Sequence, residues 1–475
     1  MIPRLPIRNR WCGALLLTFA VFAGSAHGAP RPNLIWIMAD DLGWGEVGCY
    51  GQKVIQTPHL DRMAAEGLRF THFYAGATVC APSRSVLMTG QHHGRTRVRG
   101  NAGPNNPLAQ TLQPEDVTVA RVLQGAGYVT ALIGKWGLGD EGAAESGLPR
   151  KQGFDYFFGY LNQHRAHNHF PEFLWRNEEK ILLPNPLIPV GDQGGGYSPD
   201  GLLYADDLFT DEVLKFVARH QDRPFFLYWS PVIPHANNER KRALGDGAHV
   251  PDYGPYARED WPAPDKGHAA MITRLDGYVG RLLAQLRQLN LATNTLVFFT
   301  SDNGPHGESG HDLGRFQPVG PFRGLKRSLT DGGIRVPGIA WWPGVVQAGR
   351  STDHVAYFGD WFATACELAG AAVPAGLDSI SFVPELQGRA GAQARHEFLY
   401  WEFHEGGFTQ AALFAGRWKG IRSGRPDAPL VLYDLQSDPG ETKDVAAAQP
   451  QIVARISDYL GRARTPSPDW EPRWR

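Results

Sequence analysis

The sequence predicts an α/β protein, with a large, mostly parallel β-sheet sandwiched by helices and a smaller C-terminal α+β domain. Three observations predict this fold class. Short apolar runs alternate with segments of helical periodicity through the first 388 residues, which is the pattern of strands joined by crossover helices. From about Arg389 onward the chain consists of short strand-like pieces joined by turns. Its 475 residues are 42% hydrophobic and 20% charged, so the chain can bury a large core.

The strands predicted for the large domain are short and almost continuously apolar. Such runs are typical of parallel strands that helices cover on both faces, because neither face of the sheet meets water. They are Asn33–Met38, Tyr128–Ile133, Phe225–Trp229 and Thr295–Thr300. Ile334–Trp342 is a further candidate strand, although Pro337 interrupts it.

Helical signals separate these strands. Thr57 and Pro58 have the residue types of an N-cap and a first helical position, and Gly67 is a typical helix end. Met271–Leu289 carries its apolar residues in a stripe at helical spacing. The other predicted helices are Asp116–Gln124, Ala205–Arg219 and Asp360–Leu368.

The C-terminal region predicts an antiparallel sheet with one helix. Its strand-like pieces are Phe398–Phe403, Ala411–Phe414, Trp418–Ile421 and Val431–Tyr433, and its helix is Gln449–Leu460. Connections as short as these favour antiparallel pairing. We therefore predict a large domain over residues 29–388 and an antiparallel-sheet subdomain over residues 389–475. Gly191–Gly196 and Gly245–Asp265 are rich in Gly or Pro and predict long surface loops.

The first 28 residues have the pattern of a secretory signal peptide. Arg4, Arg8 and Arg10 precede the apolar run Trp11–Ala23, and Ala26-His27-Gly28 is a suitable cleavage site. The alternative is a short membrane anchor, but the run of about 13 apolar residues falls short of the ~20 that span a bilayer. We therefore predict cleavage, a secreted or periplasmic protein and no stable membrane insertion.

Charge and cysteine content argue against a nucleic-acid-binding protein and against a disulfide-rich protein. Lys and Arg number 47 and Asp and Glu number 48, so the net charge of −1 gives no basic excess for nucleic acid binding. Four cysteines are too few for a disulfide framework. The sequence does not decide whether Cys49 and Cys366 pair.

Oxygen-bearing side chains follow two of the predicted strands. Asp40 and Asp41 come directly after the first strand, and Asp302 and Asn303 come directly after Thr295–Thr300. Ligands bind at the carboxyl ends of strands in open parallel sheets. Either pair alone is also a common turn, but together they would place four oxygen donors at one edge. Such a set suits Ca²⁺ or Mg²⁺ better than zinc.

The segment Cys80-Ala81-Pro82-Ser83-Arg84, followed by Met88-Thr89-Gly90, is the most specific signal. Alone, Cys80 would be interpreted as a buried structural thiol. Cys-x-Pro-Ser-Arg, however, directs oxidation of the cysteine to formylglycine, and average composition places it on the order of once in a thousand chains of this length.

With this motif the sequence resembles the type I sulfatases of the alkaline-phosphatase-like superfamily. The resemblance spans nearly all of the chain after the signal peptide. The other segments that carry it are Asn33–Asp41, Gly134–Gly139, Thr300–Gly304, Phe322–Lys326 and Leu432–Thr442. It implies an alkaline-phosphatase-like fold and a formylglycine-generating maturation system as a partner.

The resemblance also implies a mechanism. Residue 80, as a hydrated aldehyde, would attack sulfur with one hydroxyl and form a covalent sulfo-enzyme. The second hydroxyl would then lose its proton, and sulfate would leave as the aldehyde reforms. Asp40, Asp41, Asp302 and Asn303 match the family's ligands for one Ca²⁺ ion, which offsets charge on the sulfuryl oxygens.

Further residues match by their motif positions. Arg84 matches the arginine that orients the modified residue. Lys135 and Lys326 match the two lysines that bind sulfate, and Lys326 would also assist the leaving oxygen. His235 matches the histidine near the scissile oxygen, to which it would donate a proton.

The sequence departs from the family pattern at Gly137. Many sulfatases read Gly-Lys-Trp-His-Leu-Gly where this chain reads Gly-Lys-Trp-Gly-Leu-Gly. The base that breaks down the intermediate is therefore undefined. The segment Asn162–His169 contains three histidines, and we predict that His167 contacts residue 80 or the substrate sulfate. The alternative for His167 is that it orders a surface loop or binds a sugar hydroxyl. His306 is a weaker candidate for substrate binding.

The function predicted from these residues is hydrolysis of an organic O-sulfate ester, with a sulfated sugar as the first choice of substrate. The alternative enzyme is a phosphonate monoester or phosphodiester hydrolase with the same modified residue. The alternative outside catalysis is a sulfated-glycan-binding protein. A binding protein would not need an intact maturation signature, which counts against this last class.

Overall fold

The main element of the computed structural model is a ten-stranded sheet in the order β13-β2-β12-β11-β1-β10-β4-β5-β6-β7. Its strands are β1 Asn33–Ala39, β2 Leu68–Phe70, β4 Val129–Lys135, β5 Tyr156–Tyr160, β6 Phe173–Arg176, β7 Glu179–Leu182, β10 Phe225–Ser230, β11 Thr295–Ser301, β12 Gly338–Trp341 and β13 Arg350–Thr352. The central strands β11, β1, β10, β4 and β5 are parallel. Antiparallel pairs flank them on both sides. The predicted mostly parallel sheet is confirmed.

The structure describes residues 1, 3, 31–102, 106–142, 144–191 and 194–474. Arg31–Arg475 forms one compact unit. Nearly all of the predicted signal peptide, residues 1–28, lies outside the described residues. Among the residues described, no helix has the length and apolar character needed to cross a membrane.

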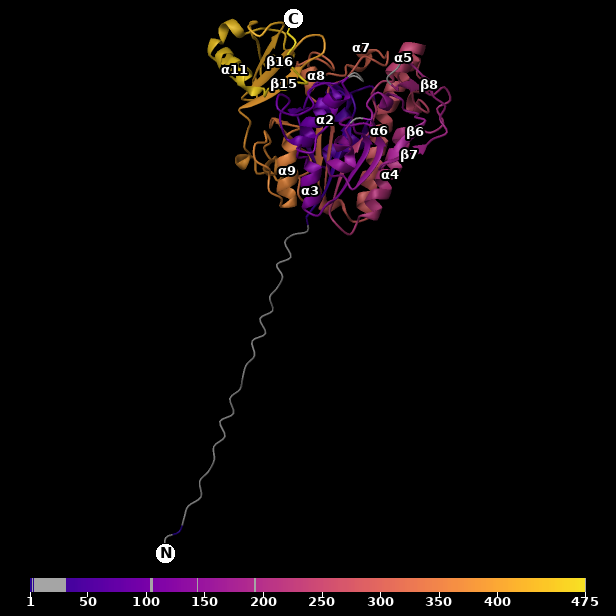
Figure 1. Cartoon of the computed structure of the whole chain (residues 1–475), viewed down its shortest axis with the longest axis vertical. Coiled ribbons are helices and arrows are strands. Elements are labelled where there is room, and N and C mark those ends of the chain that lie inside the picture. Colours follow the sequence, from indigo (N-terminus) through magenta and orange to yellow (C-terminus); the bar gives the residue numbers. More distant parts are fainter. Residues whose placement is uncertain (2, 4–30, 103–105, 143, 192–193, 475) are drawn as a thin grey trace. The chain divides into compact units, whose positions relative to one another are not determined.

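Helices cover both faces of the main sheet (Figure 1). The α-helices described before the C-terminal sheet are α1 Pro58–Ala65, α2 Cys80–Thr89, α3 Val119–Gly125, α4 Ala205–Arg219, α5 Asn238–Leu244, α6 Ala263–Gln288, α7 Leu313–Phe316, α8 Asp331–Ile334, α9 Asp360–Ala369 and α10 Val383–Leu386. One core lies against α2, α3 and α9, and the other against α1, α4 and α6. In β1, Trp36 points into the first core and the adjacent Ile37 into the second. Because neighbouring side chains of a strand point to opposite faces, both must be apolar, which explains the continuous runs.

The C-terminal part is a four-stranded antiparallel sheet, as predicted. It consists of β15 Phe398–Phe403, β16 Thr409–Phe414, β17 Trp418–Ser423 and β18 Val431–Asp434, with α11 Pro450–Ala463. Ile456 and Leu460 of α11 pack on one face of this sheet. Trp401 on the other face joins the core under α9, and its Nε1 donates a hydrogen bond to the Ala75 carbonyl. The C-terminal sheet therefore shares an apolar core with the main sheet and its helices.

Two short ribbons complete the described strands: β3 Phe73–Tyr74 with β14 Ala356–Tyr357, and β8 Ile188–Pro189 with β9 Gly196–Tyr197. The thiols of Cys49 and Cys366, whose pairing the sequence leaves open, are both free.

Several predicted element boundaries were wrong for local reasons. The helix predicted to start at Met271 starts at Ala263, inside the predicted loop 245–265. Its first turns contain Gly267, which packs against the Ala248 carbonyl and interrupts the apolar stripe. The helix predicted to start at Asp116 starts at Val119, because the Thr118 hydroxyl caps it by accepting from the Arg121 amide. The strand predicted over 334–342 is confined to β12, after Pro337.

A buried charge cluster joins the C-terminal sheet to α8. The Lys419 Nζ lies 2.7 Å from Asp331 Oδ1 and 3.2 Å from Glu441 Oε1, and all three side chains are fully buried. Arg335 Nη1 lies 3.1 Å from the other Asp331 oxygen. Burial alone would raise the pKa of Asp331, but Lys419 and Arg335 outweigh it and lower that pKa.

Lys419→Ala is expected to lower the free energy of unfolding by about 3–5 kcal/mol, because it leaves buried carboxylates without their cation. Urea unfolding followed by circular dichroism measures this. Arg425→Ala is the control, since Arg425 pairs with Asp427 where both side chains are mostly exposed, and its midpoint should not move. Equal midpoints for the two variants would contradict the proposed importance of the buried cluster.

Candidate active site

Four parallel strands deliver polar side chains to one edge of the main sheet. Asp40 and Asp41 follow β1, Asp302 and Asn303 follow β11, Lys135 ends β4, and His235 follows β10. The last residues of β1 and β11, Ala39 and Ser301, lie opposite each other in register. The two groups of oxygen donors therefore leave the sheet at the same level, as the sequence predicts for carboxyl ends of neighbouring parallel strands.

Three carboxylates and one amide form a buried cluster at this edge. The Asp41 amide donates to Asp302 Oδ1 over 3.1 Å, and Asn303 Nδ2 donates to Asp41 Oδ1 over 2.7 Å. Asp40, Asp41, Asp302 and Asn303 are all fully buried. Asp41 has a left-handed backbone with φ of 68°, a conformation that Asp tolerates better than most residues.

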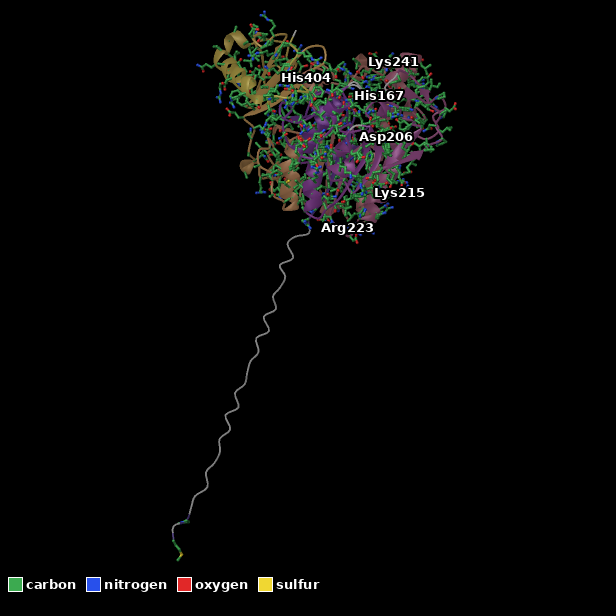
Figure 2. The ribbon with its side chains drawn as sticks, in the orientation of Figure 1. His167, Asp206, Lys215, Arg223, Lys241 and His404 are labelled. Carbon is green, nitrogen blue, oxygen red and sulfur yellow. The ribbon has the colours of Figure 1, made fainter. Side chains whose placement is uncertain are left out.

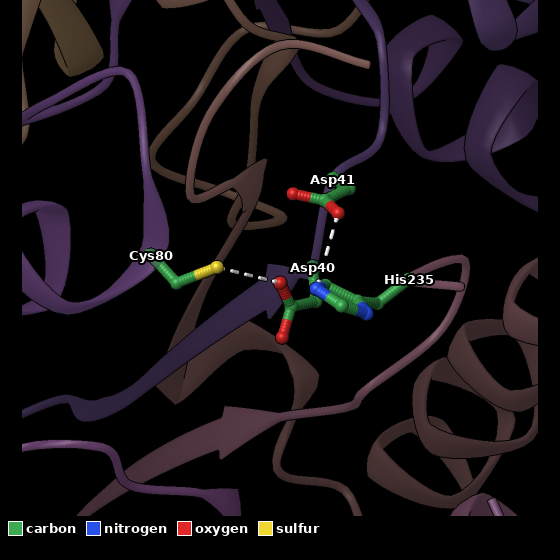
Figure 3. A group of neighbouring side chains, drawn as sticks. All are labelled: Asp40, Asp41, Cys80 and His235. Atoms are coloured by element: carbon green, nitrogen blue, oxygen red, sulfur yellow. Dashed lines mark hydrogen bonds and ion pairs between the residues drawn. The ribbon is translucent and has the colours of Figure 1, made fainter. Parts of the chain in front are cut away.

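Cys80 is the first residue of α2 and lies directly beside these carboxylates. Its Sγ donates to Asp40 Oδ1 over 3.3 Å (Figure 3). The nearest ligand atoms of Asp40, Asp41, Cys80 and His235 all lie within 4.8 Å of one another. Burial, and then the charge of Asp40, raise the pKa of the Cys80 thiol well above its usual value. The unmodified thiol is therefore held protonated, which is the opposite of an activated thiolate.

Arg84 lies one helical turn after Cys80 and binds two of the carboxylates. Its Nη2 lies 2.9 Å from Asp302 Oδ2 and 3.2 Å from Asp40 Oδ2, with no part of the side chain exposed. Its Nη1 donates to the Lys135 carbonyl over 2.7 Å. The guanidinium thus ties α2 to the ends of three strands and fixes residue 80 relative to the carboxylates.

Two buried lysines supply further positive charge. Lys135 Nζ lies 2.6 Å from Asp40 Oδ2, and Lys326 Nζ lies 2.8 Å from Asp41 Oδ2. Burial alone would raise the pKa of Asp40, but the charges of Lys135 and Arg84 outweigh it, and this pKa lies well below its usual value. Arg84, Lys135 and Lys326 thus offset the charge of the carboxylates to which they are bound, which reduces repulsion of an anionic substrate.

His235 accepts a hydrogen bond from Lys326. Its Nδ1 lies 2.7 Å from the Ala236 carbonyl and must donate there, which leaves Nε2 as the acceptor from Lys326 Nζ at 3.1 Å. Burial and then the charge of Lys326 lower the pKa of His235 well below its usual value. The imidazole is therefore neutral, and the transferable proton of the pair is on Lys326 rather than on His235.

The oxygen cluster fits a hard divalent cation. Asn303 Oδ1 is buried, and no described residue donates a hydrogen bond to it. Burial and then the charge of Asp40 raise the pKa of Asp302 to about 7, so the protein's own cations do not fully stabilise this carboxylate. An added cation would supply the missing charge, and a set of carboxylate and amide oxygens suits Ca²⁺.

Comparison with known proteins decides the family. The family model named Sulfatase matches residues 32–371. The chain belongs to the sulfatase family. This sulfatase is an enzyme that hydrolyses sulfate esters. Residues 324–464 also match the model for the C-terminal part of N-sulphoglucosamine sulphohydrolase.

Named relatives and solved structures agree with this assignment. The sulfatase is 35% identical to N-acetylgalactosamine-6-sulfatase of Sus scrofa, over 94% of this chain and 87% of the relative. It is 33% identical to human arylsulfatase A, over 93% and 89% of the two chains. A sulfatase structure from work on glycosaminoglycan metabolism by Bacteroides thetaiotaomicron superimposes with a TM-score of 0.73 at 27% identity, covering 91% of this chain and 99% of that chain.

A further structural neighbour shares the fold alone. The phosphonate monoester hydrolase of Agrobacterium radiobacter superimposes with a TM-score of 0.62 at 21% identity, covering 91% of this chain and 95% of that chain. The same architecture therefore also occurs in an enzyme named for a different ester.

The two histidines predicted to bind substrate, His167 and His306, have different surroundings in the structure. His167 stacks on His235 with ring centroids 4.7 Å apart, and its Nδ1 lies 3.0 Å from Glu239 Oε2. His306 is buried; its Nε2 lies 3.0 Å from the Pro234 carbonyl, and its Nδ1 accepts from the Glu308 amide. Both nitrogens of His306 are thus already bonded within the chain. We therefore replace its predicted substrate-binding role with support of the His235 loop.

A cavity of about 580 Å³ adjoins these histidines. It is lined by His164, His167, Val190, Gly191, Asn238, Glu239, Lys241, Arg242, Gly307 and Glu308. His167 and Lys241 lie at one end of the molecule, away from Lys215 and Arg223 (Figure 2). Glu308 Oε2 lies 3.7 Å from Lys326 Nζ, so the cavity wall reaches the groups that surround residue 80.

Sequence reasoning missed four polar residues beside the site. Glu239 and Glu308 line the cavity, and only Glu239 has a sequence signal, as a first-turn residue of the helix after Asn237. Gln163 lies where a side chain at Gly137 would begin, because a Cβ there would be 3.3 Å from Gln163 Oε1. Gln110 donates to the Gly137 carbonyl over 2.9 Å. Two amides thus surround the position at which the predicted family pattern has an imidazole.

Proposed function

We propose that this sulfatase hydrolyses the sulfate ester of a sulfated sugar, with formylglycine made from Cys80 as the nucleophile and one Ca²⁺ ion as cofactor. The observation that carries the proposal is the position of residue 80. It lies at the start of α2, inside the maturation motif, with its Sγ 3.3 Å from a carboxylate of the oxygen cluster. The choice of a sugar rests on relatives named for N-acetylgalactosamine 6-sulfate.

The surroundings of residue 80 suit a hydroxyl nucleophile. When oxidised and hydrated, residue 80 supplies two hydroxyls, one for attack on sulfur and one whose proton loss releases sulfate. Asp40 Oδ1 accepts from the Cys80 Sγ and would accept from a hydroxyl at the same place. Arg84 holds Asp40 and Asp302 in position, so the acceptor is fixed before substrate binds.

The cations would stabilise the sulfuryl oxygens during transfer. Lys135 and Lys326 are bound to Asp40 and Asp41 respectively, so each carboxylate of this pair has its own ammonium group. Positive groups that are fixed in advance stabilise developing charge without reorganisation. Asp40, Asp41, Asp302 and Asn303 would hold Ca²⁺, which would add positive charge beside the same oxygens.

The leaving oxygen needs a proton, and Lys326 is the group placed to give it. Its ammonium donates to neutral His235 and is also bound to Asp41. When Lys326 gives a proton to the departing alcohol, His235 Nε2 and Asp41 remain close enough to orient the amine. General acid catalysis of this kind contributes ~10²–10⁴-fold.

The burial of Cys80 bears on its maturation, and the first 28 residues bear on export. The Cys80 side chain has no exposed surface in the folded protein, so the maturation system must act before folding is complete. We propose export to the periplasm or cell exterior, supported by the signal-peptide pattern of the first 28 residues.

The test is a comparison of ester classes with matured, Ca²⁺-loaded protein. We expect kcat/KM for 4-nitrophenyl sulfate and for sulfated monosaccharides to exceed that for bis(4-nitrophenyl) phosphate and a phenylphosphonate monoester by at least ~10²-fold, about 2.7 kcal/mol of transition-state stabilisation. The phosphonate ester is included because of the fold shared with a phosphonate monoester hydrolase. Faster turnover of either phosphorus ester would replace the proposal by that alternative.

A further inference from the structure

Glu239 and His167 form a buried carboxylate–imidazole pair outside the oxygen cluster. His167 ends the short 3₁₀ turn Arg165–His167, and Glu239 lies in the first turn of α5. His167 Nδ1 lies 3.0 Å from Glu239 Oε2, and Arg242 Nη2 lies 2.7 Å from Glu239 Oε1. Both oxygens of Glu239 are thus bonded, so its orientation is fixed by two partners.

The pair fixes which nitrogen of His167 is free. A carboxylate accepts the Nδ1 proton, and in this tautomer Nε2 carries the lone pair of the ring. Within the part of the chain that the structure describes, no residue forms a hydrogen bond to Nε2. The side chain of His167 lines the 580 Å³ cavity, so this nitrogen is available to a molecule bound there.

The position of the pair connects it to the sulfate-binding groups. The His167 ring stacks on His235 with an interplanar angle of 14°. His235 in turn lies 3.1 Å from Lys326 and 3.4 Å from Asp41. An ester bound with its leaving oxygen at Lys326 would therefore have the stacked rings of His235 and His167, and the cavity that His167 lines, as neighbours. No contact links His167 to the Asp40, Cys80 or Asp302 side chains among the described residues, which favours recognition over attack on sulfur.

We propose that His167, oriented by Glu239, is a specificity-determining residue that accepts a hydrogen bond from a hydroxyl of the sulfated sugar. Glu239 is a positioning residue, since it acts only through His167. The inference rests on the proposed function, because it assigns the alcohol part of that substrate to this cavity. His167 would then favour sulfate esters that carry a hydroxyl beside the sulfated oxygen over esters that carry none.

The experiment compares two kinds of probe on the matured enzyme. One is 4-nitrophenyl sulfate, which has no hydroxyl; the other is the best substrate in a panel of sulfated monosaccharides that includes N-acetylgalactosamine 6-sulfate. His167→Ala should lower kcat/KM for the sugar sulfate by ~10–100-fold, as expected for a lost hydrogen bond to a buried partner, and change the aryl sulfate less than threefold. Glu239→Gln should produce a smaller loss of the same selectivity, and His167→Gln, which keeps an acceptor near Nε2, should recover part of it.

Deoxy analogues of the preferred sugar identify the hydroxyl. Removing that hydroxyl should lower wild-type kcat/KM as much as His167→Ala does, and the two losses should not add, because they remove the same contact. His396→Ala is the matched control, since it removes another buried imidazole–carboxylate pair, 2.7 Å from Asp360 and outside the site. It should lower thermal stability and leave the ratio of sugar to aryl sulfate turnover unchanged.

Three outcomes would overturn the inference while the proposed function stands. These are equal losses on both probes, no loss on either, or additive losses with every deoxy analogue. A wild-type enzyme that turns over the aryl sulfate and no sugar sulfate would overturn both the inference and the choice of a sugar in the proposed function. A wild-type enzyme that turns over no sulfate ester would overturn the proposed function itself, and with it this inference.

Discussion

Cys80→Ser is expected to reduce steady-state turnover by ~10⁴-fold or more when the protein is produced in a host whose maturation system acts on cysteine. Removal of a catalytic nucleophile reduces kcat by up to ~10⁶-fold in enzymes where this has been quantified. Serine would keep one hydroxyl beside Asp40 Oδ1 and could attack sulfur. It would lack the second hydroxyl from which sulfate is released, so the reaction would stop after one turnover.

Mass spectrometry of the peptide that contains residue 80 tests the chemical basis. In the wild-type protein this peptide should show conversion of the thiol to an aldehyde, and in Cys80→Ser it should show serine. Cys49→Ser is the control, because Cys49 is also a free thiol but lies outside the oxygen cluster, and it should keep full activity. Repeated turnover by Cys80→Ser near the wild-type rate would exclude the mechanism.

Asp302→Ala is expected to reduce activity by ~10³-fold, at the upper limit for one group that stabilises transition-state charge. The substitution removes one of three carboxylates from the cluster, so Ca²⁺ affinity should also fall. The fold should persist, because Arg84 keeps Asp40 and the Lys135 carbonyl as partners. The unpaired Asp41 amide would cost about 1–3 kcal/mol of stability.

Calorimetric titration of chelator-treated protein with Ca²⁺ measures the loss of affinity, and circular dichroism checks the fold. Asp312→Ala is the control, because Asp312 lies in the same connection but caps α7 instead of joining the cluster. It should bind Ca²⁺ with wild-type affinity. Full activity of exhaustively chelated wild-type protein would show that catalysis does not require a metal ion bound to the oxygen cluster.

Much of the fold could be predicted from the sequence because its signals are local. The continuous apolar runs of β1, β10 and β11 reflect burial on both faces, which residue types alone reveal. Short or irregular strands carry no such signal. β7 contains Glu179 and Lys180, and β13 is the short, half-buried polar tripeptide Arg350–Thr352, so neither strand was predicted.

Within the site, the sequence determined the residues that occur in motifs. Asp40, Cys80, Lys135 and Asp302 could be assigned because each lies at a strand end or inside a specific pattern, and parallel strands bring their carboxyl ends together. The sequence also predicted a histidine near the site in the segment Asn162–His169.

Only the tertiary structure decided how these residues act on one another. It placed Glu239 against His167 and Lys326 against His235, pairs that are separated by 72 and 91 positions in the chain. It also showed that His306 uses both ring nitrogens internally and is not free for substrate. Hydrogen bonds, protonation states and cavity walls depend on side chains that meet only after the crossover helices pack. A motif fixes which residue type is present, whereas its chemistry depends on partners that folding brings from distant segments.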